Sequence, residues 1–135
     1  GPHPWRVGLA KQIVAEKTFV RLREFVRLEQ PKYYAKAVPN YAQGWAFVYF
    51  LRESKVVAKH PAWSRILPTY FETLKAKYAE ALAAAGEDPP PPKVEAAQAA
   101  ARKEAVEAAF SGVSFEDLEK AWVEFVEALR DPAGK

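Results

Sequence analysis

Apolar side chains recur at steps of three and four residues along this chain, and no alternating pattern runs for more than three or four residues. Steps of three and four place side chains on one face of a helix, whereas a half-buried strand requires alternation. The clearest such face is formed by Trp63, Ile66, Leu67, Tyr70, Phe71, Leu74, Tyr78 and Leu82. The sequence therefore predicts an all-α fold.

Prolines and poor helix formers divide the N-terminal half. A helical pattern over residues 5–28 should bend near Lys17, where Thr18 and two more poor helix formers follow, and should end before Pro31. Residues 31–38 then read as a loop. The next helix, 39–52, is apolar on nearly every side, which is typical of a helix in the middle of a core.

Two further proline positions carry predictions in the C-terminal half. Pro68 should kink or split the helix that contains it, and the four prolines of residues 89–92 favour an extended connector over 87–93. An Ala-rich helix is predicted over 94–110. Ser114 is a good N-cap for a last helix that ends before Pro132.

The chain length of 135 residues suits one domain. We expect a single compact, orthogonal or bundle-like domain of about five helices over residues 4–131. Its parts would be an aromatic-rich core at 4–86, the connector at 87–93 and a C-terminal helix pair at 94–131. Residues 1–3 resemble the remnant of a cleaved tag.

Composition excludes several classes of site. The chain has no cysteine and no methionine, so disulfides, thiolate metal sites and cysteine nucleophiles are ruled out. Half of the residues are hydrophobic, enough for a packed core, yet no stretch approaches the roughly 20 apolar residues of a membrane-spanning helix. We therefore expect no membrane partner.

No set of residues has the pattern of a catalytic site. With His3 in the tag-like start, His60 is the one remaining histidine, and an ordinary catalytic zinc site takes three protein ligands. No serine lies in a Gly-x-Ser-x-Gly turn, and no glycine-rich phosphate loop is present. We expect no catalytic residue, no metal site, no cofactor and no enzymatic activity of this chain alone.

Charge is unevenly distributed. Residues 1–60 carry a net +7 and residues 61–135 a net −4. Five basic residues, with Tyr33 and Tyr34 nearby, could bind the phosphates and bases of a nucleic acid or another polyanion. They are Arg21, Arg23, Arg27, Lys32 and Lys36. The alternative is a solvated helix face balanced by the acidic half of the chain.

One segment resembles a known family. Residues 40–51 read NYAQGWAFVYFL, similar to the YAQxWxLVxFL helix downstream of the active site in gluzincin-like metallopeptidases. The nearest resemblance is to a bacterial family of unknown function common in planctomycetes. Residues 22–26 with Tyr33 and Tyr34 resemble its lead-in, and residues 110–122 resemble its closing helix. The resemblance implies a helical C-terminal subdomain of such a protein.

Members of that family carry an upstream His-Glu-x-x-His zinc helix, and a third zinc ligand follows in a Trp-x-x-Glu-Gly-Leu-Ala helix. This sequence has WRVGLA at residues 5–10, one residue short, and Val7 stands where the glutamate is expected. The His-Glu-x-x-His helix is absent from the sequence. If the alignment is right, the zinc site is lost.

Three functions follow as hypotheses. The leading one is a non-catalytic helical domain that acts as a scaffold or protein-interaction module, with a protein or the remainder of a longer parent chain as its partner. One alternative is a basic helical module that binds nucleic acid or another polyanion. The other is the cleft-forming scaffold of a zinc peptidase whose catalytic helix lies outside this chain, with Tyr41 and Gln43 facing the cleft.

Overall fold

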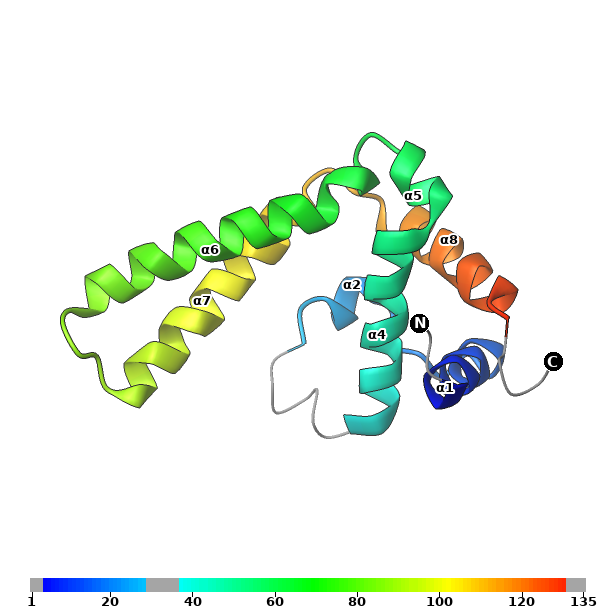
Figure 1. Ribbon diagram of the computed structural model, residues 1–135, viewed down its shortest axis with the longest axis horizontal. Coiled ribbons are helices and arrows are strands. Elements are labelled where there is room, and N and C mark those ends of the chain that lie inside the picture. Colours follow the sequence, from blue (N-terminus) through cyan, green and yellow to red (C-terminus); the bar gives the residue numbers. More distant parts are fainter. Residues whose placement is uncertain (1–3, 29–36, 131–135) are drawn as a thin grey trace. The chain divides into compact units, whose positions relative to one another are not determined.

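The computed structural model describes residues 4–28 and 37–130, and every regular element within them is helical, which confirms the all-α prediction. The elements are α1 (Pro4–Ala15), α2 (Leu22–Phe25), α4 (Ala37–Glu53), α5 (Lys55–Lys59), a 3-10 helix (Trp63–Arg65), α6 (Ile66–Ala85), α7 (Pro91–Ala109) and α8 (Phe115–Ala128) (Figure 1).

The chain forms two compact units. One unit combines Gly1–Trp63 with Ser114–Lys135, and the other is Ser64–Val113. These boundaries differ from the segments expected at 4–86 and 94–131. The reason is that α7 packs along α6, whereas α8 packs with α1 and α4.

The first unit is built around α1, α4 and α8, which pack on one another, while α2 rests on α8 and α5 on α4. Its largest fully buried apolar side chains come from α1, α2, α4 and α8: Val7, Leu22, Phe50, Leu118, Trp122 and Val126. Aromatic rings meet at tilted angles in this core. Phe19 contacts Trp122 edge-on with ring centroids 5.3 Å apart, and Phe50 lies 5.4 Å from Phe125.

The break expected near Lys17 is confirmed. Helix α1 ends at Ala15, and Lys17 has a φ of 56°, in the left-handed region. The prediction that the helical pattern continues to residue 28 was wrong, because only Leu22–Phe25 is α-helical between residues 16 and 28. Polar side chains of α4 and α8 bind the backbone of Val20 and of Leu22, the first residue of α2, and these tertiary hydrogen bonds replace helical ones.

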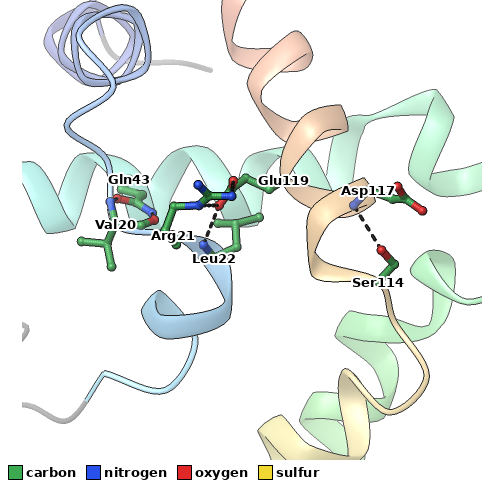
Figure 2. Close-up of polar contacts among 7 residues, drawn as sticks. All are labelled: Val20, Arg21, Leu22, Gln43, Ser114, Asp117 and Glu119. Atoms are coloured by element: carbon green, nitrogen blue, oxygen red, sulfur yellow. Dashed lines mark hydrogen bonds and ion pairs between the residues drawn. The ribbon is translucent and has the colours of Figure 1, made fainter.

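Helix α8 is capped at both ends. Ser114 Oγ accepts the Asp117 backbone N–H at 3.2 Å, which confirms the predicted N-cap (Figure 2). At the other end α8 has no basic residue of its own in its last turn. Lys11 of α1 supplies the positive charge: its Nζ donates to the carbonyl oxygens of Glu127 at 2.8 Å and Leu129 at 2.6 Å, and to that of Val126 at 3.5 Å. The lysine gives hydrogen-bond donors to carbonyls that have no intrahelical partner, and its positive charge is stabilising at the negative end of the helix dipole.

The second unit is a helical hairpin in which α6 and α7 run side by side in opposite directions (Figure 1). The α7 face that is buried consists mostly of alanines four residues apart: Ala97, Ala101, Ala105 and Ala109. Small side chains on successive turns let two helices approach closely. The Ala-rich stretch predicted as a helix therefore also forms the packing face of the hairpin.

Two expectations about proline were wrong. Helix α6 continues through Pro68 to Ala85, because Pro68 is its third residue and the N–H groups of a first turn have no intrahelical acceptor. Helix α7 begins at Pro91 inside the expected connector, with prolines at its first two positions. Only the residues between α6 and Pro91 connect the two helices, and Gly86 there has a φ of 90°.

Candidate functional site

A buried glutamine of α4 holds the chain that leads into α2. The Gln43 side chain is 1% exposed, and its amide binds the backbone of Val20 on both sides (Figure 2). Gln43 Oε1 accepts the Val20 N–H at 2.9 Å, and Gln43 Nε2 donates to the Val20 carbonyl at 2.6 Å. Gln43, expected to face a cleft, is thus committed to internal hydrogen bonds.

A buried carboxylate of α8 binds the same segment at Leu22, two residues after Val20. Glu119 Oε1 accepts the Leu22 backbone N–H at 2.9 Å and the Arg21 Nε–H at 3.1 Å, and its Oε2 lies 2.7 Å from Arg21 Nη2 (Figure 2). The Glu119 side chain is 11% exposed and that of Arg21 66%. Arg21 therefore compensates the charge of a carboxylate that is largely removed from water.

The other two described arginines of the predicted polyanion site lie over one aromatic ring. The guanidinium carbons of Arg23 and Arg27 are 5.2 and 5.4 Å from the ring centroid of Phe115. Arg27 Nη1 also donates to the Arg23 carbonyl at 2.8 Å. The structure thus brings Arg21, Arg23 and Arg27 together at the junction of α2 and α8. Lys32 and Lys36, with Tyr33 and Tyr34, lie outside the described residues.

This junction is not a purely basic surface. It has an open pocket of about 220 Å³, lined by Arg21, Arg23, Glu24, Phe115, Glu116 and Glu119. Three carboxylates line it beside two guanidinium groups. Such a mixture attracts a phosphate less than an uninterrupted cluster of arginines would.

Tyr41, the other residue expected at a cleft, lies at the surface in a cluster with two α1 residues. Its ring stacks on Trp5 with centroids 5.8 Å apart and an interplanar angle of 20°. Arg6 Nη2 donates to the Tyr41 hydroxyl at 2.8 Å, and the Arg6 guanidinium carbon lies 5.2 Å from the Tyr41 ring centroid. The rings remain accessible, with Trp5 45% and Tyr41 43% exposed.

Tyr41 also belongs to a longer apolar seam on α4. Positions 38, 41, 45, 48 and 52 follow steps of three and four, so Val38, Tyr41, Trp45, Val48 and Arg52 share one face. Val38 is 60% and Val48 43% exposed, Trp45 is half-buried, and Arg52 is exposed. The prediction that this helix lies in the middle of a core was therefore wrong for the seam face. The opposite face of α4 is buried through Ala42, Ala46 and Phe50. We call Trp5, Arg6 and the five seam residues the α1–α4 surface.

His60 has a structural contact pattern. Its Nδ1 accepts the backbone N–H groups of Ala62 at 3.2 Å and Trp63 at 3.1 Å, and its ring stacks on the Trp63 ring with centroids 4.0 Å apart. With Nδ1 as the acceptor, a neutral His60 carries its proton on Nε2. The histidine therefore caps the 3-10 helix that precedes α6.

Over residues 4–28 and 37–130 no three or more His, Cys, Asp or Glu side chains gather in a way that could hold a metal ion. None of the described helices has the length and hydropathy needed to cross a bilayer.

Tyr70 of the hairpin has its pKa raised above the usual value by burial, against a smaller lowering by the positive charge of Arg102.

Comparisons with known proteins returned no protein-family model, no curated protein and no solved structure that matches this chain.

Sequence reasoning did not identify the α1–α4 surface. Trp5 and Arg6 lie in the predicted helical stretch 5–28 and in the WRVGLA segment, and Val38 lies in the predicted loop 31–38. The spacing of 38, 41, 45, 48 and 52 does place these residues on one face of a helix, with one charged residue at the end of an otherwise apolar seam. The buried face of α4 is equally apolar, so the sequence alone does not distinguish the two faces.

Proposed function

We propose that this chain is a non-catalytic protein-interaction module, and that the α1–α4 surface is its contact surface. The observation that carries the proposal is the accessible seam on α4, extended by the Trp5–Tyr41 stack. The partner is another protein or another part of a longer parent chain.

The composition of the α1–α4 surface supports this proposal. Single exposed apolar side chains are normal on proteins, but contiguous apolar patches mark interaction sites. Trp, Tyr and Arg are the residue types that contribute most to binding at protein interfaces. Here two tryptophans, one tyrosine and two arginines share one surface with two exposed valines.

The alternatives receive less support from the contacts. A polyanion-binding site would use Arg21, Arg23 and Arg27, yet Arg21 pairs with Glu119 and the pocket beside it contains two further carboxylates. A peptidase-cleft role would use Tyr41 and Gln43, yet the Gln43 amide is occupied by Val20. Tyr41 alone remains accessible, and it belongs to the α1–α4 surface.

Photo-crosslinking in the cells that express the chain tests the proposal. A photoreactive amino acid at position 48 samples the seam, and one at position 56 is the matched control, because Val56 is an equally small, exposed apolar residue on α5. We expect a discrete covalent adduct from position 48 that is absent from position 56. Adding Trp45→Glu should remove it.

Two results would contradict the proposal. Equal labelling from positions 48 and 56, unaffected by Trp45→Glu, would show that the seam has no specific partner. Stoichiometric zinc binding together with peptide hydrolysis by the 135-residue chain would contradict its non-catalytic character.

A further inference from the structure

Resting on the proposed function, we infer that the α1–α4 surface takes an amphipathic helix of the partner protein that carries carboxylates beside its apolar stripe. The juxtaposition behind this inference is a helical seam of apolar side chains with Arg6 at its flank and Arg52 at its end. The seam defines the shape of the partner segment, and the two arginines define its charge.

The spacing of the seam favours a helix as the partner segment. Val38, Tyr41, Trp45, Val48 and Arg52 follow the three-then-four pattern of positions that face a second helix in a coiled coil. A strand or an extended peptide, whose side chains repeat every second residue, has no such match along an α-helix. From Val38 to Arg52 the seam is about 21 Å long, the rise of fourteen helical residues. A partner helix of four turns covers it.

The arginines favour carboxylates on that helix. Neither Arg6 nor Arg52 is paired with an acidic side chain within the described part of the chain, and Arg52 is the one charged residue of the seam. Arg6 uses Nη2 for the Tyr41 hydroxyl, while its buried Nε has no hydrogen-bond partner among the described residues. A guanidinium that lies against two aromatic rings is already oriented, so it loses little further freedom when it binds a carboxylate.

A selection from a helical peptide library tests the inference without knowledge of the natural partner. The library consists of displayed 18-residue helices with leucine at the positions that face the seam and random residues at the flanking positions. It is selected on the intact chain, and the recovered peptides are remeasured by fluorescence anisotropy on Arg6→Gln, Arg52→Gln and Trp45→Glu. Arg65→Gln, which alters an exposed arginine next to α6, is the matched control. Circular dichroism and thermal unfolding check that each variant is folded.

We expect Asp and Glu to be enriched at the flanking positions of the selected peptides. Their affinity should fall about tenfold on each of Arg6→Gln and Arg52→Gln, equivalent to about 1.4 kcal/mol, and should be unchanged on Arg65→Gln. Peptides that need Trp45 but show no acidic enrichment, and bind both arginine variants as well as the original chain, would overturn the inference and leave the interaction surface intact. If no selected peptide loses affinity on Trp45→Glu, the proposed function fails as well.

Discussion

The amide of Gln43 pairs with Val20 as one strand pairs with another: it accepts the backbone N–H at 2.9 Å and donates to the carbonyl at 2.6 Å. A single side chain from α4 thereby satisfies both polar backbone groups of a residue 23 positions earlier. The Gln43 side chain is itself buried, so its own oxygen and nitrogen also need partners. The two hydrogen bonds satisfy these two atoms together with the N–H and the carbonyl of Val20.

Gln43→Leu should be among the most destabilising single changes in the first unit. It removes both hydrogen bonds and leaves two partly buried backbone groups unsatisfied, so we expect a loss of about 2–3 kcal/mol in the free energy of unfolding. Urea denaturation measures it. Gln12→Leu is the control, since the Gln12 amide is bound only to the exposed Glu16 carboxylate, and its effect should stay within about 0.5 kcal/mol. Equal losses from both substitutions would contradict the role assigned to Gln43.

Glu119 stabilises the fold more through the Leu22 backbone than through Arg21. Glu119→Ala leaves a buried N–H without an acceptor and should cost about 2–4 kcal/mol. Arg21→Gln removes an ion pair whose cation is largely in water and should cost about 1 kcal/mol or less. Thermal or urea unfolding of the two variants side by side measures both losses. A larger loss from Arg21→Gln would show that the charge of Glu119, and not its backbone hydrogen bond, dominates.

Lys11→Met should weaken the attachment of α8 to α1. The methionine keeps much of the aliphatic stem but removes the ammonium group that binds three carbonyls at the end of α8, so we expect a loss of about 1–2 kcal/mol. The same change at Lys120, an exposed residue of α8, is the control for the loss of one positive charge. Hydrogen exchange of the last turn of α8 should become faster in Lys11→Met only. No difference between the two variants would contradict the capping role.

The stability of the hairpin should fall at high pH because of Tyr70. Burial raises its pKa in the folded chain, so the unfolded chain releases the proton first as the pH rises above about 10. Folding stability contributed by the neutral hydroxyl is therefore fully present below that pH and is lost above it. Tyr70→Phe should make the free energy of unfolding fall less steeply as the pH rises above about 10, measured by urea unfolding, whereas Tyr78→Phe on the same helix serves as the control. An unchanged slope in Tyr70→Phe would show that another group causes the alkaline loss.

The helices and their ends could be predicted where the cause is local. The three-and-four periodicity marks α6 and α8, and Ser114 lies at the N-cap where its residue type is favoured. Proline was harder, since Pro68 breaks a helix in its interior but is tolerated in a first turn, and the outcome depends on where the helix begins.

The candidate site depends on contacts that are distant in sequence. Val20 precedes Gln43 by 23 residues, and Glu119 follows Leu22 by 97, so no local pattern relates these residues. Helix α4 is apolar on two sides, and only the packing of α1 and α8 determines which side is covered. Tyr41 was a candidate to face a cleft because it lies near the start of that helix, but its contact with Trp5 and Arg6 follows from the tertiary structure.

The order of the two units along the chain has a consequence for biosynthesis. The hairpin is continuous, so α6 and α7 can associate as soon as both have left the ribosome, through contacts between neighbours in sequence. The first unit is interrupted by the hairpin, and its α1 and α4 are synthesised long before Leu118, Trp122 and Val126 exist to cover them. A nascent chain that stops before residue 114 therefore exposes the apolar faces that α8 later covers. We therefore expect this unit to depend on chaperones during translation until its last helix is made.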